Sequence, residues 1–170
     1  MPKSLTPVGL PESPETFNAS SFSSHLAELQ QMTDSCKNPG SCPVIIVEDD
    51  LLLRKILTIQ LEAAAIKFCA ASDGHQALAL IRSHHPKVLV LDISLPGLSG
   101  FEIIEILKQD PSLSDLANMQ LIVHTALDLS TEDRQRMSFG HAQFLTKTRV
   151  GKEFTEVVRR ALSGPESTEN

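Results

Sequence analysis

Polar side chains that could do chemistry follow several short apolar runs of this chain. A triplet of acids follows the run VIIV, a single acid follows VLVL, and two later runs end in a hydroxyl and an ammonium group. The residues are Glu48, Asp49, Asp50, Asp92, Thr125 and Lys147. A carboxylate directly after a buried strand is costly to desolvate unless another charge compensates it. We therefore expect these groups to lie together and to act on one another.

Together these groups suit the transfer of a phosphoryl group to a carboxylate. Asp92 would be the nucleophile that takes the phosphoryl group. Such transfer depends mainly on positioning and on charge neutralisation, which Lys147 would supply as a point charge and Thr125 as a hydrogen-bond donor. Neighbouring carboxylates repel one another unless a cation lies among them, and hard oxygen ligands with room for water suit Mg²⁺. We expect Glu48, Asp49 and Asp92 to hold this ion.

Each of these residues also has an ordinary explanation. Asp49 or Asp50 could simply cap the N-terminus of a following helix, and a lysine at the end of a strand is usually a solvated charge. The convergence of acids, hydroxyl and ammonium at the ends of strands favours a shared site over separate coincidences.

The apolar runs alternate with helical patterns along most of the chain. The expected strands are 44–47, 66–70, 88–91, 120–124 and 142–145. The expected helices are 51–64, 74–83, 100–109, 130–138 and 152–162. Strict alternation predicts an α/β fold, with a doubly wound five-stranded parallel sheet and helices on both faces. The sites of such sheets lie at the shared carboxyl edge of the strands, so this fold would bring the polar residues together.

The buried face of the first expected helix is ambiguous in the sequence. Its candidate core stripe, at near-helical spacing, is Leu52, Ile56, Ile59 and Leu61. Three further leucines leave the facing open, and these are Leu51, Leu53 and Leu57.

Composition restricts the possible partners of the chain. The formal net charge of -6, with no basic stripe among aromatic residues, argues against binding to nucleic acid or to a membrane surface. No window approaches the roughly 18 apolar residues of a membrane span, and the N-terminus lacks the apolar core of a secretory signal. A cytoplasmic location is therefore expected.

The three cysteines, Cys36, Cys42 and Cys69, form no recognisable metal-binding motif. The sequence has no C-x-x-C, and no histidine lies at ligand spacing from a cysteine pair. An odd number of cysteines in a chain without a secretory signal predicts reduced thiols. A disulfide between Cys36 and Cys42 is the less favoured alternative.

The chain divides into three predicted parts. Residues 1–42 are rich in proline and serine and should be mostly disordered, although 20–33 could form a short amphipathic helix. Residues 43–163 form the predicted domain, and 164–170 should be a disordered tail. If the chain is whole, no DNA-binding or enzymatic output domain follows, and its output would be a contact with another protein.

Residues 43–162 resemble a response-regulator receiver domain of two-component signalling. The matching stretches are VIIVEDD followed by LLLRKIL, then DGHQAL, VLVLDISLPGLSG, LIVHTA and FLTK. The resemblance implies the flavodoxin-like strand order 2-1-3-4-5, and it implies that Asp92 is the phosphoacceptor. It also implies that Mg²⁺ is bound directly by Asp49, through water by Glu48, and by the backbone carbonyl of Ser94.

The resemblance further implies a conformational switch on the last two strands. Thr125 and Lys147 match the switch hydroxyl and the phosphate-binding lysine, and Phe144 matches the aromatic switch residue. The family usually has a cis proline after the lysine; here Thr148 follows, so a trans bond is expected, because a cis bond there would cost about 3 kcal/mol. Gln143 stands where many relatives have an acid of the dimer face, and a monomer or weak dimer is expected.

An active receiver of this kind takes its phosphoryl group from a phosphohistidine on a histidine kinase or a histidine phosphotransfer protein. It would be no enzyme beyond its own phosphoryl transfer and dephosphorylation. It would signal to a downstream protein through helix 130–138, strand 142–145 and helix 152–162. The alternatives are an interaction module that keeps the fold without phosphorylation, and the excised receiver of a hybrid histidine kinase. A magnesium-dependent phosphatase is disfavoured, because that chemistry would need an acid where Ser94 stands.

Overall fold

A computed structural model of the protein describes residue 40 and residues 42–164. Our predictions for 1–42, with the helix 20–33, and for 164–170 fall outside the described residues, except at positions 40, 42 and 164. No helix in the described part is long and apolar enough to cross a membrane.

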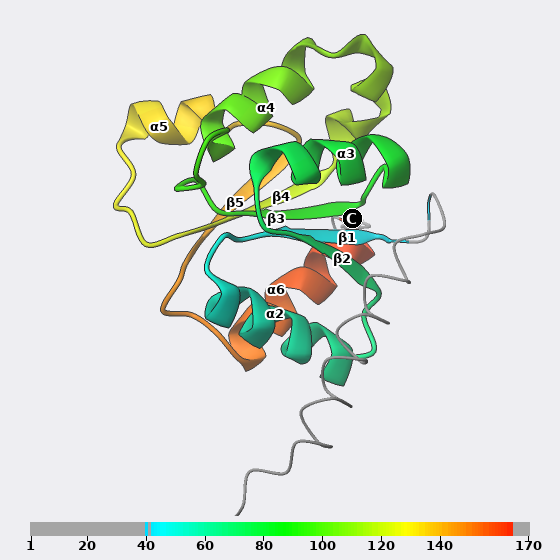
Figure 1. Ribbon diagram of the computed structural model, residues 1–170, viewed down its shortest axis with the longest axis vertical. Helices are drawn as coiled ribbons and strands as arrows, with labels where there is room; N and C mark the ends of the chain where they lie inside the picture. Colours follow the sequence, from blue (N-terminus) through cyan, green and yellow to red (C-terminus); the bar gives the residue numbers. More distant parts are fainter. Residues whose placement is uncertain (1–39, 41, 165–170) are drawn as a thin grey trace, which may run out of the picture.

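Five parallel strands form one sheet, as the alternation of apolar runs predicts (Figure 1). They are β1 (Val44–Val47), β2 (Phe68–Ala71), β3 (Val88–Leu91), β4 (Gln120–Thr125) and β5 (His141–Thr146). The strand order is β2-β1-β3-β4-β5, which confirms the predicted doubly wound arrangement. Because every pair is parallel, the carboxyl ends of all five strands share one edge.

Helices cover both faces of this sheet. They are α2 (Leu51–Ala63), α3 (Gly74–His84), α4 (Gly100–Gln109), α5 (Thr131–Arg136) and α6 (Lys152–Ser163). In Figure 1, α2 and α6 lie on one face, while α3, α4 and α5 lie on the other. A 3-10 helix that was not predicted, η2 (Pro111–Asn118), follows the cap residue Asp110 and buries Leu113 and Leu116.

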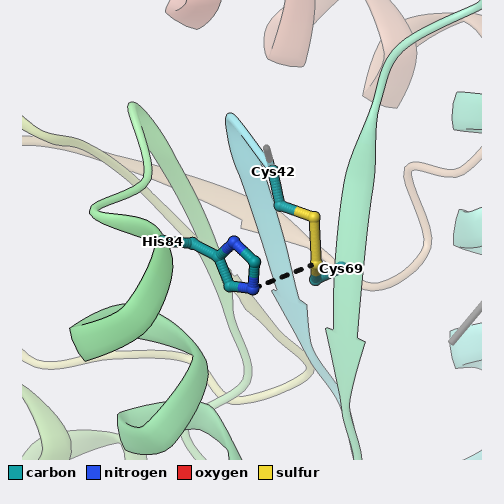
Figure 2. A group of neighbouring side chains, drawn as sticks. All are labelled: Cys42, Cys69 and His84. Carbon is teal, nitrogen blue, oxygen red and sulfur yellow. Dashed lines mark hydrogen bonds between the residues drawn. A yellow bond between two sulfur atoms is a disulfide. The ribbon is translucent and has the colours of Figure 1, made fainter. Parts of the chain in front are cut away.

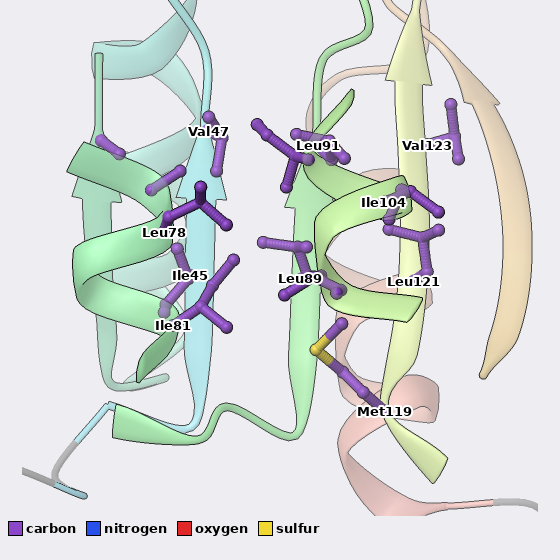
Figure 3. Packing of buried hydrophobic residues seen from close by; sticks show 14 of the residues in the cluster. Ile45, Val47, Leu78, Ile81, Leu89, Leu91, Ile104, Met119, Leu121 and Val123 are labelled. Carbon is purple, nitrogen blue, oxygen red and sulfur yellow. The ribbon is translucent and has the colours of Figure 1, made fainter. Parts of the chain in front are cut away.

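The core consists of two apolar layers on opposite faces of the sheet. Alternate side chains of a strand point to opposite faces, so Ile45 and Val47 pack under α3 and α4 while Val44 and Ile46 face α2 and α6. Figure 3 shows the first layer, where Ile81 of α3 lies beside Ile45. Strands apolar on both faces are typical of a covered parallel sheet.

Helix α2 buries only part of its predicted core stripe, in which Leu61 is confirmed as a buried residue. Leu57, Thr58 and Leu61 are its buried residues. Leu52 and Ile59, two candidates for the core stripe, are 69% and 49% exposed, so that part of the prediction is wrong. Leu57 and Leu61 are four residues apart and therefore lie one above the other on a helix, which is how both reach the sheet.

The expectation of reduced thiols is also wrong for two of the cysteines. Cys42 and Cys69 form a disulfide, with their Cα atoms 5.8 Å apart. Cys42 precedes β1, and Ile45 of that strand is in register with Cys69 of β2, so sheet pairing joins residues 27 positions apart. The alternative disulfide between Cys36 and Cys42 is not formed, since Cys42 bonds to Cys69; Cys36 itself lies outside the described residues.

Candidate functional site

Two buried carboxylates lie side by side at the carboxyl edge of the sheet. Glu48 directly follows β1 and Asp92 directly follows β3, and each is 1% exposed. The register pairs Val47 with Leu91, and the Asp92 amide donates a hydrogen bond of 3.0 Å to the Val47 carbonyl. The pairing of β1 with β3 therefore fixes the two acids next to each other.

Lys147 supplies the positive charge that these two acids require. Its amide donates to the Thr125 carbonyl at 3.0 Å, which holds it against the end of β4. Its Nζ lies 2.7 Å from Glu48 Oε1 and 2.7 Å from Asp92 Oδ2. The following bond to Thr148 is trans, as expected, like the other peptide bonds of residues 42–164.

The pKa values of Glu48 and Lys147 reflect burial and the neighbouring charges. Burial raises the pKa of Glu48 above its usual range; the Lys147 hydrogen bond opposes this rise, and the charge of Asp92 adds to it. For Lys147, burial works to lower the pKa, but the hydrogen bonds and charges of Asp92 and Glu48 outweigh it and hold the pKa above its ordinary value. Lys147 is therefore a fixed positive charge.

The three consecutive acids after β1 have three different environments, and Glu48 is the buried one. Asp50 is the N-cap of α2 and accepts a hydrogen bond of 2.7 Å from the Leu53 amide through its Oδ1. This resolves the question of which acid caps the helix. Asp49 remains exposed at the rim, and the Arg54 guanidinium donates to the backbone carbonyls of Glu48 and Asp49.

A divalent cation fits this group of acids. Oxygen atoms of Glu48, Asp49 and Asp92 all lie within 4.8 Å of one another. Glu48 Oε2 is buried and has no hydrogen-bond partner among the described residues. Three carboxylates and one ammonium leave a formal charge of two negatives, which a divalent ion would balance, and their oxygens are the ligands that Mg²⁺ prefers.

Ser94 lies next to the phosphoacceptor candidate. Its amide donates a hydrogen bond of 3.1 Å to Asp92 Oδ1, so the loop after β3 orients that carboxylate. The predicted use of the Ser94 carbonyl as a metal ligand stays a prediction.

The predicted switch residues occupy the last two strands. Thr125 is buried at the end of β4, and its Oγ1 accepts a hydrogen bond of 3.1 Å from the Leu127 amide. Phe144 of β5 is half-buried, and the Arg134 guanidinium of α5 lies 4.6 Å from the centre of its ring. Arg134 therefore links α5 to β5 by a cation–π contact, which the sequence analysis did not predict.

His124 is a site residue that the sequence analysis also missed. It is buried in β4 directly before Thr125, and its Nδ1 lies 4.0 Å from Glu48 Oε2. Neither ring nitrogen has a hydrogen-bond partner among residues 42–164. Burial, followed by the charge of Lys147, lowers its pKa to about 4 against the opposing effect of Asp92. A histidine inside the apolar run LIVHT was the available signal.

Comparisons with known proteins agree with this geometry. A family model described as the response regulator receiver domain matches residues 44–159. The polar-differentiation response regulator DivK of Brucella ovis is 30% identical over 119 residues, covering 70% of this chain and 94% of the relative.

Solved structures are similar over the same part of the chain. The receiver domain of a signal transduction histidine kinase from Syntrophus aciditrophicus is 26% identical, with a TM-score of 0.61, and the match covers 75% of this chain and 94% of that one. The chemotaxis protein CheY4 of Vibrio cholerae also gives a TM-score of 0.61, at 21% identity, over 71% of this chain and 98% of its own. At 21% identity, the likeness to CheY4 concerns the fold alone.

Proposed function

Because this chain belongs to the response-regulator receiver family, we propose that it is a phosphoacceptor switch of a two-component phosphorelay, with Asp92 as the residue that is phosphorylated. The observation that carries this proposal is the contact of Lys147 Nζ with Glu48 and Asp92, each at 2.7 Å. This contact supports the proposal because it joins two buried carboxylates to a fixed cation at one end of the sheet, as phosphoryl transfer to a carboxylate requires.

The proposed reaction is the transfer of a phosphoryl group from a phosphohistidine to Asp92. A carboxylate oxygen of Asp92 attacks the phosphorus of a phosphohistidine, the new P–O bond forms, and the P–N bond breaks. The electron pair of that bond stays on the imidazole nitrogen, which then takes up a proton. Lys147 and the Ser94 amide orient the Asp92 carboxylate, and positioning of this kind is the main contribution of a protein to phosphoryl transfer.

Mg²⁺ is the cofactor of the proposed reaction, held by Glu48, Asp49 and Asp92, with the Ser94 carbonyl as a further ligand. When bound there, the ion would neutralise negative charge on the phosphoryl oxygens. The unsatisfied Glu48 Oε2 and the formal charge of the group support this assignment.

The output is a change in a protein-binding surface. Thr125 would turn toward a phosphoryl oxygen and Phe144 would move with it, altering the surface formed by α5, β5 and α6. The partners in this proposal are a histidine kinase or histidine phosphotransfer protein as donor and a downstream protein as target, in the cytoplasm. The chain has no catalytic role beyond its own phosphoryl transfer and dephosphorylation.

A receiver from a hybrid histidine kinase is the second candidate for the protein's place in a pathway. The likeness to the kinase receiver of Syntrophus aciditrophicus favours it. The chemistry at Asp92 is the same in both cases. The alternative of an interaction module without phosphorylation has no support from the site. The acids, the hydroxyl and the ammonium group that phosphoryl transfer needs are all present in the sequence.

The test is phosphorylation by a small donor. The full chain is incubated with acetyl phosphate and Mg²⁺, and its intact mass is measured. We expect the mass of one phosphoryl group to be gained, to be lost in Asp92→Asn, and to be kept in the matched control Asp50→Asn, because Asp50 only caps α2. The absence of a gain in the unchanged protein, or a gain that survives Asp92→Asn, would refute the proposal.

A further inference from the structure

A second cluster of ligand-type side chains lies away from the phosphorylation site. Cys42 and Cys69 are each 1% exposed and His84 is 4% exposed. Cys42 precedes β1 and His84 ends α3, which places the cluster toward the amino ends of the strands, opposite the edge that carries Asp92. Figure 2 shows the imidazole of His84 pointing at the two sulfur atoms.

We propose that these three residues form a site for a thiophilic divalent ion such as Zn²⁺ in the reduced protein, and that the disulfide is the oxidised, metal-free form of the same site. The donor atoms of Cys42, Cys69 and His84 lie within 4.8 Å of one another. Thiolate and imidazole are ligands that select Zn²⁺ over Mg²⁺, so this ion and that of the acidic site would not compete.

One ligand pair already lies near the spacing of tetrahedral coordination. Zn–S and Zn–N bonds of about 2.3 and 2.0–2.1 Å place two ligand atoms roughly 3.5–3.8 Å apart. His84 Nε2 lies 4.0 Å from the Cys69 sulfur, so this pair needs a movement of only a few tenths of an ångström. The sulfur atoms must separate once their bond is broken. Three protein ligands leave a fourth position for water.

Three elements hold the ligands in place. The carbonyl of Pro43, next to Cys42, accepts hydrogen bonds from the amides of Lys87 and Val88 at 2.9 and 3.0 Å. Cys69 is fixed by strand pairing with β1. The helix that carries His84 ends on a hydrogen bond of 3.0 Å from the His85 amide to the Ile81 carbonyl. Ligands set on a sheet and a helix end favour binding, because little chain entropy remains to be lost.

The two forms interconvert by a balanced reaction. A dithiol reductant donates two electrons and two protons, the S–S bond breaks to give two thiols, and the reductant becomes a disulfide. When Zn²⁺ binds, both thiols release their protons and the neutral imidazole of His84 donates its lone pair. Metal and disulfide therefore exclude each other at this site.

His84 distinguishes this proposal from a purely structural cross-link. A disulfide requires no imidazole, whereas a site with two thiolates gains a third ligand from His84. The proposed cytoplasmic location also favours the reduced form, because thiols are kept reduced there.

The experiment uses the full chain, reduced with a dithiol and then freed of it under argon. Mg²⁺ is present in excess to occupy the acidic site, and Co²⁺ is added as a spectroscopic substitute for Zn²⁺. We expect one Co²⁺ per chain with a sulfur-to-cobalt charge-transfer band, its displacement by Zn²⁺, and a higher Tm with Zn²⁺. Cys69→Ser should abolish the band.

His84→Gln is the decisive variant, and His85→Gln is its matched control. His85 is the neighbouring residue, but its side chain pairs with Asp115 at 2.6 Å instead of facing the sulfurs. Loss of outer-shell partners of a metal costs 10–100-fold in affinity, so loss of the His84 ligand should weaken Zn²⁺ binding by at least about tenfold. His85→Gln should leave the affinity unchanged.

Oxidation provides the test of folding. Both histidine variants should still lose the mass of two hydrogens and form the disulfide between Cys42 and Cys69, which shows that the fold is kept. A reduced protein without the charge-transfer band, or equal Zn²⁺ affinity in His84→Gln and the unchanged chain, would overturn the metal site. In that case the residues form only a disulfide.

Discussion

Replacing His124 with leucine should remove a large part of the protein's sensitivity to acid. His124 is 1% exposed, and its ring nitrogens have no hydrogen-bond partner in the described part of the chain. Burial, and then the nearby charge of Lys147, lowers its pKa from 6.5 to about 4. The folded protein therefore keeps this imidazole neutral under conditions in which the unfolded chain would protonate it.

The direction of the effect follows from proton binding. As the pH falls below 6.5 the unfolded chain takes up a proton at His124, while the folded protein does so only near pH 4. Stability that is present above the unfolded pKa is thus lost as the pH falls between these two values. Between pH 7 and pH 5 the loss from this residue amounts to roughly 2 kcal/mol.

The assay is urea denaturation of the unchanged protein and of His124→Leu, with a chelator present, at both pH values. At pH 7 the variant should be at least as stable, because an apolar side chain replaces a buried ring without hydrogen-bond partners. At pH 5 the variant should be more stable by roughly a further 2 kcal/mol. Both proteins keep every carboxylate, so the effects of carboxylate protonation cancel when their free energies of unfolding are compared. The reasoning would be refuted if the difference in free energy of unfolding between the two proteins were the same at pH 7 and at pH 5.

Three further substitutions probe the site and its support. A Cβ at Gly100 would lie 2.6 Å from the Asp92 carbonyl oxygen, so Gly100→Ala should lower the free energy of unfolding by about 1–3 kcal/mol; an unchanged urea midpoint would contradict this. Lys147→Met removes the ammonium that competes with a metal for Glu48 and Asp92, so calorimetry should show tighter Mg²⁺ binding. Weaker binding would contradict the competition between Lys147 and the metal. Asp50→Ala should cost about 1 kcal/mol of stability through its lost cap without changing Mg²⁺ affinity, and a fall in that affinity would make Asp50 a ligand.

The candidate functional site was predictable because strand ends are visible in the sequence. Asp92 follows an apolar run, and parallel pairing requires that such ends meet at one edge. The contact of Lys147 with both buried acids depends on side-chain geometry. The positions of the strand ends in the sequence do not indicate which acid the lysine contacts. The division of roles between Asp49 and Asp50 was open for a similar reason, since both are acids at the start of a helix.

Other features depend on contacts between distant segments. Cys42 and Cys69 are joined because β1 pairs with β2, and no spacing rule connects residues 27 positions apart. The buried face of α2 was ambiguous because its apolar residues surround much of the helix. Only the packing of the helix against the sheet determines that Leu57 and Leu61 are buried. Short elements such as η2 have too few residues to show a period.

The acidic run after β1 also sets how the protein tolerates changes in chain length. Of its three residues, Glu48 is buried, Asp49 is exposed, and Asp50 accepts a hydrogen bond from an amide in the first turn of α2. Deleting one of them while keeping the helix would rotate every later side chain of α2 by about 100° relative to the strand. Leu57 and Leu61 would then turn away from the sheet. Asparagine or serine at position 50 preserves the cap, so this segment should accept some substitutions and reject single-residue insertions and deletions.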